Sequence, residues 1–174
     1  MASSDWFLEQ ARLGKMYHAA SAGAVTLSTV STTLTGLSLS NDWGSGKLLV
    51  VKKVNFAPSN APAGVAVVGI AIHTALSTTA TVHTTPMVIH NAIAKGTVSS
   101  SAIGKADAAA TLASTPLWLR AMASVAAASS VTPTNYTDFT DGDIIVAPGG
   151  ALSLSYLTTA AVGIASITWV EIDE

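Results

Sequence analysis

The chain has 174 residues and no cysteine, which suits a single domain with its own hydrophobic core and excludes disulfides and thiolate metal sites. Charged residues make up only 10% of it, against roughly 25% in an ordinary soluble domain. The net charge of −2 argues against nucleic acid as a main partner, and no apolar run reaches the about 20 residues that a membrane-spanning helix needs.

The scarcity of charge is the most informative property of the sequence. Hydrophobic residues make up 49% of the chain and the mean hydropathy is +0.50, while Ser, Thr, Ala and Gly supply most of the remaining surface. One explanation is a weakly charged soluble domain. The other, which we favour, is that neighbouring subunits cover much of the surface, because the cores of protein interfaces are depleted in charge.

The N-terminal residues 3–14 predict the only convincing helix, with a serine cap, Asp5 in the first turn and Gly14 at the end. No basic leader followed by an apolar run precedes it, so no secretory signal is predicted. So short a helix is not stable alone, and its apolar side chains need a surface on their own domain or on a neighbouring subunit. We assign residues 1–22 to an N-terminal arm and residues 23–174 to a separate domain. The arm residues expected to dock on a partner are Trp6, Phe7, Leu8 and Leu13.

From residue 24 onward the pattern becomes that of β-strands, in which apolar and small polar residues alternate. Clusters of glycine, proline and asparagine mark the turns between them. Residues 105–114 tolerate a helix, and residues 129–140 predict a long loop. The predicted strands are residues 25–28, 37–40, 48–56, 65–72, 81–84, 87–92, 117–124, 143–147, 151–158 and 164–172.

This pattern predicts an all-β fold. Roughly eight to ten short strands separated by turns indicate a sandwich or a barrel rather than an α/β fold. A jelly roll accommodates this number of strands in two sheets with little exposed edge. We therefore expect an antiparallel β-sandwich with the topology of a jelly roll and a short N-terminal helical arm.

The strand predicted at residues 65–72 is apolar on both faces, whereas a half-exposed antiparallel strand alternates cleanly. We expect a second sheet to cover one face, and a loop or another chain to cover the other. Tryptophans spread singly through strands are usually core or interface anchors. The residues predicted to pack the contacts between subunits of an oligomer are Val65, Val67, Val68, Ile70, Ile72 and Trp169.

The sequence offers little chemistry for an active site. No two histidines stand two apart on one strand, as a metal site on a sheet face favours, although His73, His83 and His90 could converge across strands. Residues 138–143 hold three carboxylates around a glycine but lack the spacing of a calcium loop, and a tight turn before a strand explains them. We predict no catalytic residue, no cofactor and no metal, and hence a protein that is not an enzyme.

Two C-terminal runs carry a resemblance. Residues 141–155, Asp-Gly-Asp-Ile-Ile-Val-Ala-Pro-Gly-Gly-Ala-Leu-Ser-Leu-Ser, and residues 167–172, Ile-Thr-Trp-Val-Glu-Ile, resemble the closing strands of small tailed-bacteriophage virion proteins, among them head decoration (cement) proteins and related jelly-roll modules. The cysteine-free body rich in Ser, Thr and Ala, with an apolar N-terminal arm, is similar to them as well. The resemblance implies homotrimers that are made in the host cytoplasm and sit on the capsid exterior. There they would bind the major capsid protein and clamp neighbouring lattice subunits against internal pressure.

Two other functions stay open. A receptor- or glycan-binding module of a phage tail fibre or spike would need exposed aromatic residues, such as Trp43 and Tyr136, clustered at one end of the sandwich. A cupin-like metalloenzyme would need its three histidines to converge. The structural virion protein is the function that we expect, with the major capsid protein and its own copies as partners.

Overall fold

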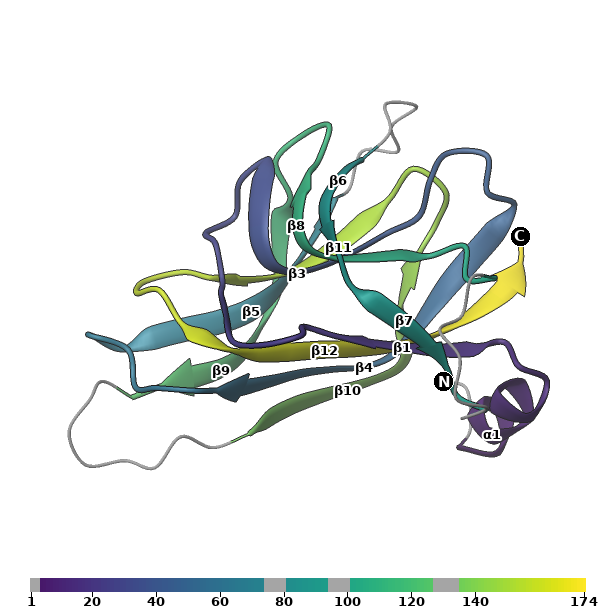
Figure 1. Ribbon diagram of the computed structural model, residues 1–174, viewed down its shortest axis with the longest axis horizontal. Coiled ribbons are helices and arrows are strands. Elements are labelled where there is room, and N and C mark those ends of the chain that lie inside the picture. Colours follow the sequence, from purple (N-terminus) through teal and green to yellow (C-terminus); the bar gives the residue numbers. More distant parts are fainter. Residues whose placement is uncertain (1–3, 74–80, 94–100, 127–134) are drawn as a thin grey trace.

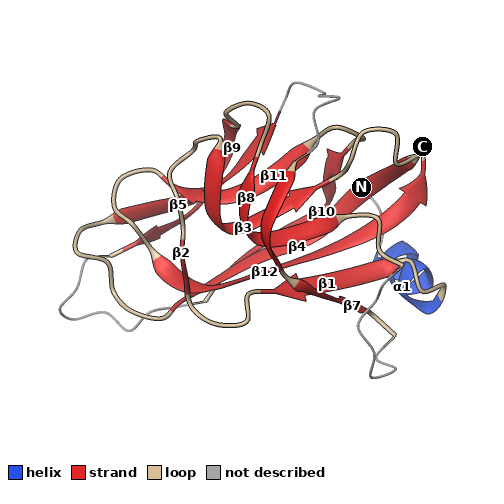
Figure 2. Ribbon diagram, turned by 45° about the horizontal axis from the view of Figure 1, so that its top comes forward, coloured by secondary structure: helices blue, strands red, loops and turns tan. Residues whose placement is uncertain are grey.

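A computed structural model of the chain describes residues 4–73, 81–93, 101–126 and 135–174 (Figure 1). They form a β-rich molecule with one short helix near the N-terminus (Figure 2). The elements are α1 (Ser4–Arg12), β1 (Met16–Ala20), β2 (Val25–Thr26), β3 (Thr33–Ser40), β4 (Lys47–Pro58), β5 (Ala66–His73), β6 (Val82–Pro86), β7 (Val88–Asn91), β8 (Lys105–Thr111), β9 (Leu117–Val125), β10 (Tyr136–Val146), β11 (Ala151–Tyr156) and β12 (Val162–Asp173).

The strands form two antiparallel sheets that share one core. Sheet A has the order β10-β4-β12-β1-β7, and the two-residue strand β2 pairs with β12 beside this path. Sheet B has the order β6-β8-β3-β11-β5-β9. The prediction of an all-β antiparallel sandwich with a short N-terminal helix is confirmed.

The strand pairing is that of a jelly roll. The first strand, β1, pairs with the last, β12, and moving inward along the chain β3 pairs with β11, β4 with β10 and β5 with β9. The chain is thus one long hairpin rolled up so that successive pairs fall in opposite sheets. The remaining strands β6, β7 and β8 are inserted between β5 and β9, and they extend the far side of both sheets.

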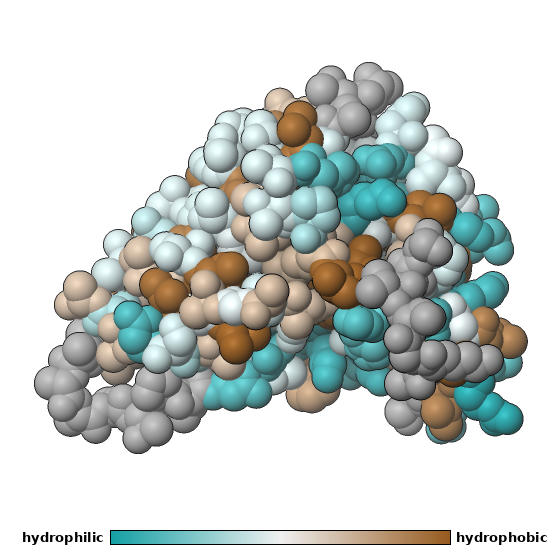
Figure 3. All heavy atoms as spheres, in the orientation of Figure 1, coloured by the Kyte–Doolittle hydropathy of each residue, from teal (hydrophilic) through white to brown (hydrophobic). Residues whose placement is uncertain are grey.

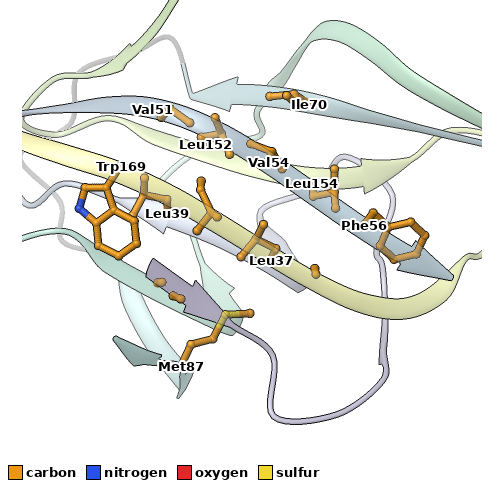
Figure 4. Packing of buried hydrophobic residues seen from close by; sticks show 14 of the residues in the cluster. Leu37, Leu39, Val51, Val54, Phe56, Ile70, Met87, Leu152, Leu154 and Trp169 are labelled. Atoms are coloured by element: carbon orange, nitrogen blue, oxygen red, sulfur yellow. The ribbon is translucent and has the colours of Figure 1, made fainter. Parts of the chain in front are cut away.

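The core lies between the sheets, where alternation along each strand places its apolar side chains. The serines that alternate with them on β3 and β11 are buried as well, at no more than 1% exposure. Figure 4 shows side chains of both sheets meeting there, among them Leu37, Leu39, Ile70, Leu152 and Leu154 from sheet B and Val51, Val54, Phe56 and Trp169 from sheet A. Each of these side chains is at most 1% exposed. Truncating one of the larger ones to alanine would cost about 2–5 kcal/mol.

Trp169 is held by polar partners at one end of this core. Its indole nitrogen donates to Glu171 Oε1 at 3.1 Å, and the same oxygen accepts the N–H groups of Ile103 at 2.9 Å and Gly104 at 2.8 Å. A Cβ at Gly104 would lie 2.9 Å from the indole nitrogen, so glycine is required for this approach. Trp169 is therefore a core residue of its own chain, which corrects its assignment to contacts between subunits.

A β-bulge explains why two lysines stand in the middle of β4. The register of β4 with β12 shifts between Thr168 and Trp169, which leaves Lys52 as an extra residue. Because of this extra residue, Val51 and Val54 both face the core although they are three positions apart. The apolar alternation of the sequence is interrupted here without a break in the strand.

Helix α1 packs on the outer face of sheet A. Its main contact is Phe7, which is 1% exposed and belongs to one cluster with Met16, Val170 and Val50, a row that crosses β1, β12 and β4. The ammonium group of Lys52 lies 5.2 Å from the centroid of the Phe7 ring, a cation–π contact. Phe7 is buried against its own domain, which corrects its assignment to docking on a partner.

The first strand also corrects the predicted domain boundary. β1, which the sequence pattern does not predict, lies between β12 and β7 in sheet A and pairs with both. Residues 1–22 are therefore not a separate arm, because the sandwich itself begins at Met16.

Two further segments differ from the prediction. The helix-tolerant residues 105–111 form β8, in which Ala106 and Ala110 are buried at 2% and 1% exposure. Of the expected loop 129–140, residues 136–140 begin β10, and residues 129–134 lie outside the described part of the chain. Alanine is a poor strand former by propensity, and tertiary packing overrides that preference here.

The two long edges of the sandwich are built differently. At the closed edge, β6 pairs with β8 in sheet B and β7 pairs with β1 in sheet A, and only Met87 separates them, so one run of chain serves both sheets. At the open edge, β9 ends sheet B and β10 ends sheet A, each with one paired neighbour among the described residues. Figure 1 shows β9 and β10 along the lower border of the view.

Candidate functional site

The three histidines of the possible metal site do not converge. His73 on β5 is bonded through Nε2 to the Ser114 hydroxyl at 2.6 Å, His83 lies on β6, and His90 is exposed on β7. In sheet B, β8, β3 and β11 separate β6 from β5. Within the described ranges, no group of three His, Asp or Glu side chains is placed to hold a metal ion. The constellation that a cupin-like metalloenzyme needs is therefore not formed by these histidines.

A buried carboxylate lies at the closed edge. Asp107 on β8 has a side chain that is 1% exposed, and its Oδ2 lies 2.7 Å from Nδ1 of His83 on β6. Burial raises the pKa of Asp107, and the hydrogen bond with His83 opposes this rise. The second oxygen, Oδ1, is buried without a hydrogen-bond partner. The pair fastens the edge strand β6 to its neighbour, which is a structural role.

The acidic segment 138–143 is neither a calcium loop nor a turn between strands. It lies within β10, at a register shift against β4, and its backbone has positive φ at Asp141 (44°) and Gly142 (92°). Asp138 accepts two hydrogen bonds of 2.8 Å from the guanidinium of Arg120 on β9. The segment is a bulge in the open edge, which corrects the predicted turn, and one of its carboxylates joins the two sheets.

The open edge carries a group of exposed apolar side chains. They are Leu117 (59% exposed), Trp118 (38%) and Leu119 (43%) on β9, with Phe139 (64%) and Ile145 (52%) on β10. The one charged residue of β9, Arg120, is already paired with Asp138. Monomeric proteins normally protect strand edges with charge, so an apolar edge without free charge on β9 marks this side as an interaction surface.

The rest of the surface is also poor in charge. Figure 3 shows one face of the molecule, on which small pale residues and brown apolar ones cover much of the described surface and strongly hydrophilic residues form separate patches.

Two hollows flank Leu119 at the open edge. One, of ≈ 350 Å³, is lined by residues of β5, β9 and β10, namely Ile72, His73, Leu119 and residues 143–147, together with Gly150 and Ala151. The other, of ≈ 200 Å³, is lined by Val67, Trp118, Leu119, Arg120, Ala121 and Leu157. Leu119 is itself an extra residue in β9, because the register with β5 shifts around it. A partner side chain on either side of Leu119 would find an apolar recess.

Addition of a further strand does not suit this edge. β9 has two register shifts against β5, and β10 has one against β4. Each bulge bends its strand and interrupts the regular row of N–H and C=O groups that an added strand would need. The edge therefore suits side-chain packing better than the addition of a strand.

The predicted docking and packing residues fall into three groups. The core of their own chain contains Phe7, Val68, Ile70 and Trp169, each at most 1% exposed, so these cannot contact another chain. The solvent-exposed group is Leu8 (61%), Leu13 (60%) and Val65 (53%). The half-buried group is Trp6, Val67 and Ile72, of which the last two line the hollows of the open edge. Strand β5 is thus buried along most of its length by its own chain, and only Val67 and Ile72 remain half-buried on it.

The aromatic residues of the possible glycan site are not brought together. Trp43 is 54% exposed in the turn between β3 and β4, whereas Tyr136 begins β10 opposite Phe56, near the other end of β4. Most of the length of β4, about 30 Å at roughly 3.3 Å per residue, separates them. The two side chains therefore form no common platform for a sugar.

Comparison with protein-family models, with curated proteins and with solved structures finds no match for this chain. Among the described residues, no helix has the length and apolar character that crossing a bilayer requires.

The sequence pattern identifies β9 as a strand but misses its exposed apolar residues. The available signal is local: three large apolar residues stand together at 117–119, where a half-buried strand would alternate. Phe139 gives a second signal, because it is a lone aromatic residue in an otherwise polar segment. Neither signal tells which side of the sandwich the two strands occupy, since that depends on the pairing of distant segments.

Proposed function

We propose that the chain is a structural virion protein that decorates a bacteriophage capsid and stabilises it by binding the lattice of the major capsid protein as an oligomer. The observation that carries this proposal is the open edge, where five large apolar side chains, between 38% and 64% exposed, surround one cation that is already paired. Exposing such an edge to water is unfavourable, and burying it against a protein surface is favourable.

Three further properties support a virion protein. The two runs that resemble the closing strands of phage head decoration proteins form the end of β10, nearly all of β11 and half of β12. The jelly roll is frequent among viral capsid domains, although a fold by itself does not decide a function. A charged content of 10% also suits a protein whose working state is covered by neighbours.

The energetics favour binding at many sites at once. Fully burying a large apolar side chain is worth about 1.5–3 kcal/mol, so completing the burial of five that are about half exposed supplies roughly 4–7 kcal/mol. Association itself costs an estimated 4–15 kcal/mol. One open edge therefore gives a weak contact, and a trimer that offers three of them to a repeating lattice would gain strength through avidity. Leu8 on α1 and Leu13 just after its end, both exposed, are a second proposed contact.

The test is co-sedimentation with capsid shells of the phage that encodes the chain. The double variant Leu119→Ser, Phe139→Ser removes two apolar side chains from the open edge. The matched control, Val82→Ser with Val88→Ser, removes two similarly exposed ones (60% and 50%) from the closed edge. We expect the first variant to lose shell binding and the control to keep it.

Other outcomes would overturn the proposal. If the wild-type protein stays in the supernatant with intact shells, or if both variants bind equally well, the open edge is not a capsid contact. A glycan array distinguishes the receptor- or glycan-binding alternative. Sugar binding that is lost in Trp43→Ala, together with no shell binding, would assign the chain to a tail fibre or spike.

A further inference from the structure

A row of basic side chains crosses the outer face of sheet A. His90 on β7 stands opposite His18 on β1, His18 opposite Thr168 on β12, and Thr168 opposite Lys53 on β4. The bulge residue Lys52 adjoins this row from β4. We call His90, His18, Lys53 and Lys52 the basic row.

The side chains of the row interact with one another but not with an acid. His18 Nδ1 is hydrogen-bonded to the Thr168 hydroxyl at 2.9 Å, and Lys52 lies over the Phe7 ring. The pKa of His18 is lowered by its burial, and further by the nearby charges of Lys53, Lys52 and His90. None of the ion pairs formed by the described residues includes a member of the row. The row is thus a site of positive potential that the chain does not neutralise.

The neighbouring rows of the same face hold no carboxylate. On one side lie Val88, Ala20, Ser166, Asn55 and Thr137, and on the other Met16, Val170, Val50 and Ile145. The acids of the adjoining elements α1 and β10 are Asp5 and Glu9, both exposed, Asp138, which is paired with Arg120, and Asp141 and Asp143 in the bulge of β10. The basic row therefore has a face of neutral residues around it, in a molecule whose net charge is −2.

We infer that the basic row docks an acidic segment of the protein partner that covers the open edge. The inference rests on the proposed function and names the chemistry of that partner: an apolar patch bordered by carboxylates. The two surfaces are continuous, because Phe139 of the open edge stands opposite Lys53, at the end of the row. Charged groups at the rim of an apolar contact set orientation and partner choice more than affinity.

A protein carboxylate fits this row better than a polyphosphate does. The row is short, since it spans four neighbouring strands or about 14 Å at ~4.8 Å per strand. Two of its four members are histidines, and burial lowers the pKa of His18, which reduces the positive charge of the row at neutral pH. A net-negative protein would repel a long polyanion, whereas a few discrete carboxylates meet only the local positive potential.

The histidines make the expected contact dependent on pH. The charged groups around His18 are His90 on β7, Lys52 and Lys53 on β4, and the exposed Asp5, Glu9 and Arg12 of α1, while its neighbour on β12 is the uncharged Thr168. A bound carboxylate favours the protonated imidazoles. Binding should therefore tighten as the pH falls from 8 to 6, where glutamate remains ionised.

The probe is a fluorescein-labelled octaglutamate peptide, measured by fluorescence anisotropy at low ionic strength with the full chain. Lys53→Glu reverses a charge in the row, and Lys105→Glu makes the same change in net charge at an exposed position on sheet B. We expect Lys53→Glu to weaken binding about tenfold and Lys105→Glu to change it less than about twofold. Equal losses in the two variants would overturn the inference, because they would report net charge alone.

Three further measurements decide the remaining cases. Wild type should gain affinity by up to about fivefold between pH 8 and pH 6, and His90→Gln should reduce this gain. The protein could instead bind octathymidylate or heparin more tightly than the peptide, with the same loss of affinity in Lys53→Glu. That result would overturn an acidic protein as the partner. Self-association in sedimentation velocity that is abolished by Lys53→Glu would assign the row to a second copy instead. Because the peptide assay contains no shells, its failure leaves the open-edge proposal standing, and failed shell binding leaves the peptide result intact.

Discussion

The closed and open edges connect the two sheets with different parts of the chain. At the closed edge the backbone connects them: Met87, 8% exposed, stands where the chain passes from sheet B to sheet A, and its N–H donates to Ala106 O at 2.8 Å. At the open edge side chains connect the sheets, through the ion pair of Arg120 on β9 with Asp138 on β10. A jelly roll can therefore close one edge with its own backbone and leave the other edge open to a partner.

The difference also separates stability from interaction. Met87 at the closed edge lies in the core, whereas the five large apolar side chains of the open edge are between 38% and 64% exposed. The bulges of β9 and β10 protect the open edge from uncontrolled strand addition, yet they leave its side chains accessible. Substitutions at the closed edge should accordingly change folding, and those at the open edge should change binding.

The largest expected effect on stability is at the closed edge. Met87→Ala removes a buried side chain at the point where the chain passes from β6 in sheet B to β7 in sheet A, and it should lower the free energy of unfolding by about 2–4 kcal/mol. Urea denaturation followed by tryptophan fluorescence measures this loss. The neighbouring control, Val88→Ala, changes a side chain that is 50% exposed and should cost well under half as much. Equal losses would mean that Met87 does not hold the sheets together.

A second effect at the closed edge depends on pH. Burial raises the pKa of Asp107, so the folded state favours its protonated form. The stability that this form contributes is complete below the unfolded-state pKa of about 3.9 and is lost as the pH rises through the folded-state pKa. Asp107→Asn fixes a neutral group that can still accept a hydrogen bond from His83. We expect the variant to gain stability relative to wild type as the pH rises from 3 to 7.

The comparison is a pair of urea-denaturation series over that pH range. Asp42→Asn is the control, because Asp42 is 3.9 Å from His83 Nε2 and its side chain is 44% exposed. It should leave the pH profile nearly unchanged. A variant Asp107→Asn that is less stable than wild type at every pH would instead mean that the ionised carboxylate holds β6 in place.

Much of the fold follows from local pattern, and the exceptions have physical causes. Period-two alternation identifies β4, β11 and β12, and a continuous apolar run identifies β5, because each strand has one face in a common core. β1 is missed because its inward residues, Tyr17 and Ala19, differ greatly in size and are flanked by His18 and Ala20. β8 is missed because the closed edge has room only for alanines, and alanine carries no strand signal.

The candidate site depends on information that no local pattern contains. β9 and β10 are both edge strands because of the way distant strands pair. In this jelly roll the first strand pairs with the last, and the pairing continues inward along the chain. Val68 and Ile70 show the same limit, since their apolar character fits a core and an interface equally well. Only the three-dimensional arrangement shows that these two are buried and that Leu119 and Phe139 are not.

A smaller loss is expected from the side-chain link of the open edge. Arg120→Ala breaks the two hydrogen bonds to Asp138, and both side chains are partly exposed, at 35% and 17%. The free energy of unfolding should fall by about 1 kcal/mol, and the loss should shrink in high salt. The exposed pair of Lys47 with Asp173 is the control, and Lys47→Ala should cost less. No change in Arg120→Ala would leave the open edge without a stabilising link.

The smallest effect on stability should come from the residues that matter most for binding. Leu119→Ser with Phe139→Ser alters two side chains that are already 43% and 64% exposed, so the free energy of unfolding should change by no more than about 1 kcal/mol. The same variant should lose the capsid contact and remain more soluble than wild type, because less apolar surface meets water. Urea denaturation and light scattering of one preparation measure both properties. A large loss of stability would mean that the open edge is part of the core rather than a surface reserved for a partner.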